Sequence, residues 1–156
     1  MSAADLAAVL EQYRAGLESE LILLVHLQKI AARQHEMTQS ADIDALQRAT
    51  DRRDTLTADL MKVEDQMRPL RDRLTRDQAS AQQLPGFDHA VALYQTIARM
   101  VAEVLETDGH SVRALAQIVG ARRAAVQDAE QAEATLAAYG RAAVRPRTAT
   151  LVNRRG

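Results

Sequence analysis

The chain has 156 residues, a formal net charge of −1 at pH 7 and no cysteine, so a disulfide framework and a catalytic thiol are both excluded. Aromatic residues are scarce, with one Phe, three Tyr and no Trp, while alanine, leucine, arginine and glutamine dominate. This composition is typical of a helical or coiled-coil protein and disfavours β-sheet folds.

Charge is distributed unevenly along the chain. Residues 1–25 hold four acidic side chains against one arginine, whereas residues 141–156 hold five arginines and no acidic side chain. The longest purely apolar run, residues 21–25, is far too short to cross a membrane, and no basic-then-apolar leader opens the chain. We therefore expect a soluble, cytoplasmic protein without membrane insertion.

The first predicted helix covers residues 2–38, with Ser2 as its cap. The polar connection at 38–42 is short, which makes the next helix antiparallel to the first, and Ser40 is the predicted cap of that second helix. The apolar positions of the first helix recur every three or four residues: Leu6, Leu10, Tyr13, Leu17, Leu21, Leu24, Leu27 and Ala31.

The second predicted helix covers residues 42–78 and has the most regular spacing. Arg53 is the one polar residue in its seam, and Pro69 is expected to bend the helix without ending it. Residues 78–88 lose the period and contain a Pro-Gly pair, so they form the second predicted loop, with Asp88 capping the next helix. The seam consists of Leu46, Ala49, Arg53, Leu56, Leu60, Val63, Met67, Leu70 and Leu74.

The third predicted helix covers residues 88–139 and is longer than the other two. Gly140 is expected to end it, and residues 141–156 to form a flexible, disordered basic tail. A break at Asp108-Gly109 into a fourth helix is the rival topology. The predicted seam is Val91, Tyr94, Ala98, Val101, Leu105, Asp108, Val112, Leu115, Val119, Arg122, Val126, Ala129, Glu133 and Leu136.

These patterns predict an all-α fold: an elongated, coiled-coil-like antiparallel bundle of three long helices over residues 1–140. The first two helices match the third only as far as roughly residue 125, so its remainder should project by roughly 20 Å at 1.5 Å per residue. That end carries Val126, Ala129, Leu136 and Tyr139 on one stripe. A lone apolar stripe favours docking of a partner helix, although closing a homodimer and fraying remain alternatives.

Catalytic and metal-binding sites are weakly supported. His26 and Lys29 match the H-x-x-K pattern of histidine phosphotransfer bundles, but Ile30 stands where that family has glycine. His35 and Glu36 are adjacent and face different sides of a helix, unlike a metal pair at i and i+4. The arginines of the tail lack interleaved aromatics for nucleic acid. We expect a non-enzymatic protein without cofactor, metal site or nucleic-acid partner.

Three stretches resemble the FlgN family of flagellar type III export chaperones, which are small helical proteins. The segment SADIDALQRATDRRDTL is similar to the family's Gly-Asp-Ile/Leu-x-Ala-Leu turn with its charged second helix. The segment TDGHSV lies where the family has an asparagine-rich stretch of the third helix. The end, AAYGRAAVRPRTATLVNRRG, resembles the family's Tyr-Gly-Arg followed by a tail that ends in two arginines.

This resemblance implies a chaperone that binds the C-terminal helices of hook-filament junction proteins (FlgK-like and FlgL-like). It would prevent their premature polymerisation and deliver them to an FlhA-like export gate protein. The family's gate-docking tyrosine corresponds by position to Tyr139. A self-associating coiled-coil scaffold is the alternative. The predicted partner-binding residues are Val112, Leu115, Val119, Arg122, Val126, Ala129 and Leu136, with Leu151 and Val152 as anchors from the tail.

Overall fold

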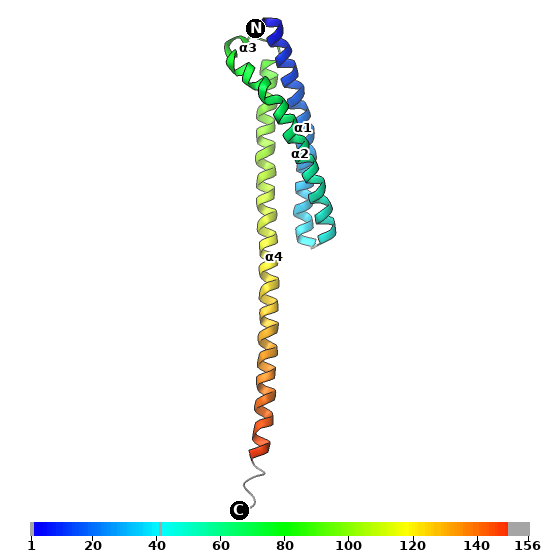
Figure 1. Ribbon diagram of the computed structural model, residues 1–156, viewed down its shortest axis with the longest axis vertical. Helices are drawn as coiled ribbons and strands as arrows, with labels where there is room; N and C mark the ends of the chain where they lie inside the picture. Colours follow the sequence, from blue (N-terminus) through cyan, green and yellow to red (C-terminus); the bar gives the residue numbers. More distant parts are fainter. Residues whose placement is uncertain (1, 41, 150–156) are drawn as a thin grey trace, which may run out of the picture. The chain divides into compact units, whose positions relative to one another are not determined.

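A computed structural model describes residues 2–40 and 42–149 of the chain, with side chains as far as residue 141. Four helices follow one another: α1 (Ala3–Ser40), α2 (Ile43–Arg76), α3 (Gln78–Ala81) and α4 (Phe87–Ala149) (Figure 1). The described residues contain no strand, so the predicted all-helical class is confirmed for them. By its internal contacts the chain divides after Ala114 into two units.

Side-chain caps begin the first two long helices. The Ser2 hydroxyl oxygen accepts the Asp5 backbone N–H at 3.1 Å, and the Asp5 carboxylate accepts from the Ser2 N–H at 3.1 Å, so the predicted cap is confirmed. The cap predicted at Ser40 is wrong, because Ser40 is the last residue of α1 and donates to the Met37 carbonyl. Asp42 caps α2 instead, accepting the Ala45 N–H at 3.0 Å.

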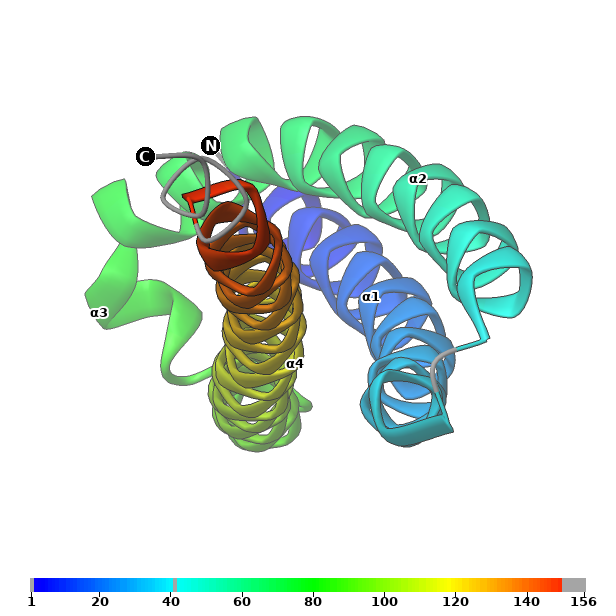
Figure 2. The same ribbon diagram turned by 90° about the horizontal axis from the view of Figure 1, so that it is seen from below.

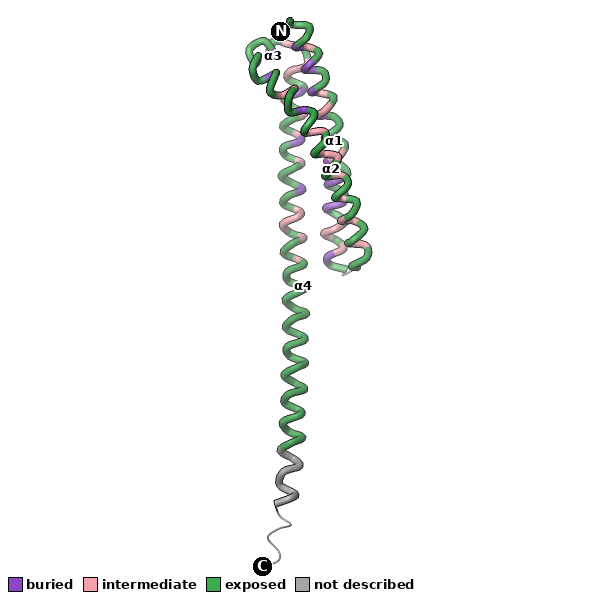
Figure 3. Tube along the Cα trace, viewed as in Figure 1, coloured by how far each residue is buried: buried purple, intermediate pink, exposed green. Residues whose placement is uncertain are grey.

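α1 provides the centre of the first unit. Figure 2 shows it between α2 and the first part of α4, and buried residues lie on all three helices (Figure 3). Each large apolar side chain removed from water contributes about 1.5–3 kcal/mol. The buried apolar side chains of these three helices therefore dominate the stability of the unit. The core cluster includes Leu6, Leu10, Tyr13, Leu17, Leu24 and Leu27 of α1, Met67 and Leu74 of α2, and Ala90 and Ile97 of α4.

Gly16 allows α1 and α2 to approach each other closely. A Cβ atom at this position would lie 2.6 Å from Cγ and 2.8 Å from Sδ of Met67, far inside contact distance. Met67 is itself fully buried, which leaves its side chain little room to move away. The missing side chain of Gly16 is therefore a packing requirement of this helix pair.

The segment between α2 and α4 differs from the predicted loop. α2 continues through Pro69 to Arg76, as predicted, but residues 78–81 form the short helix α3. Gly86 has a φ of 88°, a conformation that glycine adopts without steric cost, and α4 begins directly after it at Phe87. The cap predicted at Asp88 is therefore wrong. The Asp88 carboxylate lies in the first turn of α4, where it interacts favourably with the positive end of the helix dipole.

α4 is one unbroken helix. It passes through Asp108-Gly109, so the predicted continuity is confirmed and the rival break there is wrong. It also continues through Gly140 to Ala149, so the predicted helix end at residue 139 is wrong. A glycine inside a helix costs only about 1 kcal/mol relative to alanine, and the neighbouring alanines favour the helix. The rest of the predicted tail, residues 150–156, lies outside the described residues.

Between residues 90 and 105, the face that α4 buries is not the predicted seam, although the seam residue Asp108 is half-buried. Tyr94 and Leu105, both seam positions, are 52% and 64% exposed. The packed face lies one residue earlier in the sequence, which is about 100° around the helix. Both series are apolar at the same spacing, so periodicity predicted the stripe correctly but not the side that packs. The buried or half-buried positions are Ala90, Leu93, Ile97, Met100 and Val104.

Candidate functional site

The second unit carries a mainly apolar stripe of side chains, all of which are exposed. Every described side chain from residue 119 to residue 141 is exposed, and Figure 3 draws this part of α4 in the green of exposed residues. Leu136 and Tyr139 are 70% and 72% exposed, values unusual for such large apolar side chains. We call the following residues of this unit the distal stripe: Leu115, Val119, Arg122, Val126, Ala129, Glu133 and Leu136.

The structure thus places the predicted partner-binding residues of α4 on the surface. Val112, the remaining one, is exposed in the first unit, while Leu151 and Val152 lie outside the described residues. Arg122 is the one cation of the distal stripe, and none of the ion pairs among the described residues includes it. Tyr139 borders a shallow hollow on α4 that Ala134, Thr135 and Ala138 line, so its ring stands beside small side chains.

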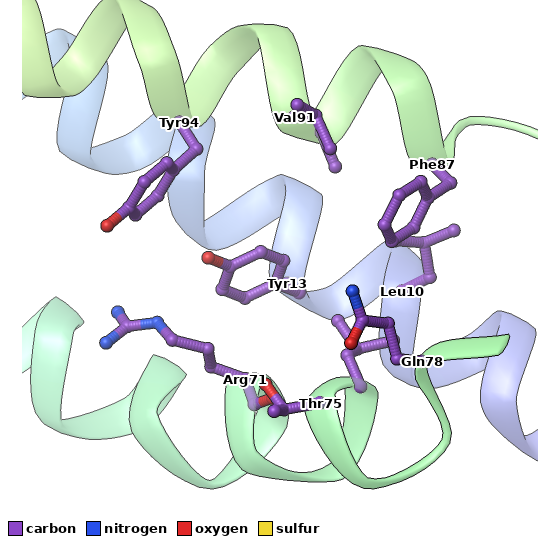
Figure 4. Close-up of a pocket in the computed structure, with 10 residues that line it drawn as sticks. Leu10, Tyr13, Arg71, Thr75, Gln78, Phe87, Val91 and Tyr94 are labelled. Atoms are coloured by element: carbon purple, nitrogen blue, oxygen red, sulfur yellow. The ribbon is translucent and has the colours of Figure 1, made fainter. Parts of the chain in front are cut away.

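A groove opens between α2 and α4 in the first unit, with α1 as its floor. It comprises two cavities of about 390 Å³ and 530 Å³ that share Arg71 and Tyr94, and the lining is mainly apolar. Figure 4 shows the first cavity, where Tyr13, Arg71 and Tyr94 come from α1, α2 and α4. On the second cavity Met61 of α2 is 64% exposed. We call this feature the α2–α4 groove.

A polar network lies on the floor of the α2–α4 groove. The Arg71 guanidinium donates to both Glu64 oxygens, at 2.7 and 2.9 Å. Burial, a hydrogen bond with Glu64 and the charge of Glu64 raise the pKa of Glu20 to about 7, and Glu20 is only 5% exposed. Hydrogen bonds to Glu64 and to Tyr13 raise the pKa of Arg71. The Nε of Arg71 is buried and has no hydrogen-bond partner.

A second polar cluster fixes the first part of α4 on α1 and α2. Arg53 and Asp108, the two polar residues of their predicted seams, form a two-pronged ion pair, and Arg53 also donates to Gln34 at 2.9 Å. Gln28 donates to Glu103 at 2.8 Å. The hydrogen bond to Asp108 raises the pKa of Arg53. Asp108 therefore sets the register of the helices through a pairing with Arg53 that was not predicted.

The histidines do not form a metal centre. The rings of His35 and His110 are 6.3 Å apart between centroids, and Ser111 Oγ lies 3.4 Å from Nδ1 of His35. The closeness of the two rings was not predictable from local spacing, because His35 lies on α1 and His110 on α4. In the part of the chain that the structure describes, no group of three or more His, Cys, Asp and Glu side chains could hold a metal ion.

No family model, curated protein or solved structure matches this chain. Among residues 2–40 and 42–149, no helix has the combination of length and apolar content that crossing a membrane requires. The function must therefore be inferred from the two apolar surfaces, the distal stripe and the α2–α4 groove.

Proposed function

We propose that the chain is a non-enzymatic, cytoplasmic helix-binding protein that acts as a flagellar export chaperone of the FlgN type. The observation that carries the proposal is the exposure of the distal stripe, because apolar residues at helical spacing on a helix surface are the usual docking site of an amphipathic helix. In this proposal α1, α2 and the first part of α4 form an antiparallel three-helix bundle that supports the binding helix.

The distal stripe has the chemistry that a chaperone of self-assembling helices needs. Proteins that polymerise through apolar helical seams must have those seams covered until assembly. Val126 and Leu136, at helical spacing, can each contribute about 1.5–3 kcal/mol when a client helix buries them. A few such anchors, and not the total area, set the affinity of a helical interface.

The resemblance to FlgN chaperones supplies the identity of the partners in this proposal. The clients would be the C-terminal helices of FlgK-like and FlgL-like hook-filament junction proteins, and the receiving partner an FlhA-like export gate protein. Tyr139 would dock to the gate. Its ring is exposed beside Ala134, Thr135 and Ala138, whose small side chains leave room for a partner.

Client binding can be tested with a chain that ends at residue 125 and with Val126→Asp in the full chain. Both variants should lose co-purification with FlgK-like and FlgL-like proteins while circular dichroism shows that the remaining helices persist. Ala124→Asp, an exposed position on the opposite side of the same helix from the distal stripe, is the matched control and should bind normally. Client binding that survives in Val126→Asp and in the shortened chain would contradict the site.

Gate docking has a separate test. Tyr139→Ala should keep client binding and lose binding to the FlhA-like protein in a calorimetric titration. Gln131→Ala, which shortens an exposed side chain of α4 outside the distal stripe, is the control. An unchanged gate affinity in Tyr139→Ala would refute the assignment of this residue.

The second candidate function is a self-associating structural scaffold. The same exposed stripe favours it, because a helix with an apolar seam can pair with a copy of itself. Sedimentation of the chain with and without a client helix separates the two functions. A scaffold stays associated in the presence of the client, whereas a chaperone forms a complex with it.

A further inference from the structure

The α2–α4 groove and the distal stripe are two exposed apolar surfaces of the same chain. On the groove side, α4 presents Val91, Tyr94, Ala98 and Val101, and the exposed Leu105 continues the same spacing; we call these five residues the proximal stripe. We propose that the α2–α4 groove of one copy holds the distal stripe of a second copy, with the two α4 helices antiparallel and the exchange reciprocal. The chain is thus its own partner, through two unlike surfaces.

The spacing of the two stripes matches in this antiparallel arrangement. Each proximal position has a distal position opposite it, because both series alternate steps of three and four residues. Val91 faces Leu136, which can fill the 390 Å³ cavity, and Val101 faces Val126 at the 530 Å³ cavity. The complete set pairs residues 91, 94, 98, 101 and 105 with residues 136, 133, 129, 126 and 122 of the second copy.

Charge complementarity favours the antiparallel pairing. Glu133 of the second copy lies opposite Tyr94, where the groove is lined by Arg68 and Arg71 together with Glu64 and Asp65. Glu64 already holds Arg71, so the exposed Arg68 is the cation that the incoming carboxylate can reach. Arg122 of the second copy lies opposite Leu105, next to the exposed Glu106. A parallel pairing in register would instead place Glu133 against Glu133 and Arg122 against Arg122, which is repulsive.

Reciprocity doubles the contact. A two-fold axis makes each copy donate its distal stripe and accept the other's, so one dimer contains two equivalent groove–stripe contacts. Ala98 faces Ala129 in each contact, and two alanines allow the helix backbones to approach most closely at this layer. Together, three apolar or small layers, one acid beside Arg68 and one arginine beside Glu106 specify the register.

This inference does not rest on the identity of any client. In the free protein the second copy covers the distal stripe, and a client helix would compete with it for the same residues. The two proposals can therefore fail separately. A dimer that binds no client would refute the chaperone function and support the reciprocal dimer. A monomer that binds clients would refute the reciprocal dimer and support the chaperone function.

Cysteine cross-linking tests the register directly, since the chain contains no cysteine of its own. Two variants, Ala98→Cys and Ala129→Cys, are mixed and oxidised, and non-reducing gels should show a cross-linked dimer in the mixture. Either variant alone should stay uncross-linked, because like positions lie roughly 45 Å apart along the antiparallel helices at 1.5 Å per residue. Ala98→Cys mixed with Ala116→Cys, an exposed position off the stripe, is the mismatched control.

Equal cross-linking of the matched and mismatched mixtures would overturn the proposal, and so would efficient cross-linking of Ala129→Cys with itself. Sedimentation velocity gives a second measurement. The unaltered chain should be a dimer, and Tyr94→Asp or Val126→Asp, both at exposed positions, should each weaken dimerisation at least tenfold without loss of helicity. A monomeric unaltered chain, or a Tyr94→Asp chain that dimerises as tightly as the unaltered one, would refute the groove as the binding surface.

Discussion

Glu20→Gln should stabilise the protein at neutral and alkaline pH. Glu20 is buried in the α2–α4 groove, where burial and the neighbouring Glu64 raise its pKa to about 7 from the ordinary 4.5. Its protonated form can donate a hydrogen bond to Glu64, whose carboxylate Arg71 holds at 2.7 Å. A glutamine amide has the same shape and donates in the same direction at every pH, so the variant keeps the network and removes the buried charge.

The direction of the pH dependence follows from proton linkage. Between pH 4.5 and about 7 the folded chain retains a proton on Glu20 that the unfolded chain releases, so stability falls as the pH rises through this window. The difference between the two pKa values corresponds to about 3 kcal/mol. We expect Glu20→Gln to exceed the unaltered chain by about 2–3 kcal/mol at about pH 8 and to match it at about pH 4.5.

Urea unfolding followed by circular dichroism, at one protein concentration and at several pH values, measures this difference. Glu18→Gln, an exposed glutamate on the same helix, is the control and should change the free energy of unfolding by less than about 0.5 kcal/mol. A Glu20→Gln variant that is no more stable at about pH 8, or whose gain does not shrink towards about pH 4.5, would refute this account of the buried carboxyl.

Three further substitutions probe the helix contacts by the same unfolding assay. Gly16→Ala should lower the free energy of unfolding by about 1–3 kcal/mol, because its Cβ would lie 2.6 Å from Met67 Cγ. In a Met67→Ala background most of that loss should disappear, and additive losses would contradict the contact. Asp108→Ala should cost about 1–3 kcal/mol by leaving Arg53 partly buried without its acid, and the Arg53→Ala, Asp108→Ala double variant should lose less than the two single losses together. Gly120→Ala, with open space around its Cβ position, should stabilise α4 by about 1 kcal/mol and slow hydrogen exchange there, and unchanged exchange would contradict it.

The parts of the fold that follow from local spacing were predictable from the sequence. Leu6, Leu10, Leu17 and Leu24 were predicted on one face of the first helix, and they are buried together. Helix continuity through Gly109 also followed, because the apolar period keeps its phase there. Such predictions succeed because the helical period and the burial of one stripe are properties of a single segment.

The features that were missed depend on contacts between segments. α4 has two apolar series one residue apart, and only packing on α1 decides that Ile97 is buried while Ala98 faces the groove. Glu20 was passed over because glutamates are rarely buried, although alternating steps of three and four from Leu17 lead to it and on to Leu24. Arg53 and Asp108 lie in the apolar seams of two different helices. Within either seam alone each is only a polar residue among apolar ones, and nothing local predicts that the two form an ion pair.

The α1–α2 hairpin, in which α1 ends at Ser40 and α2 begins at Ile43, has a consequence for synthesis in the cell. Its contacts all lie within residues 3–76, so none of them requires α4. The hairpin can therefore form on the ribosome before α4 has left the exit tunnel. The nascent chain would then offer a bare apolar floor, open to any amphipathic segment that arrives before its own last helix.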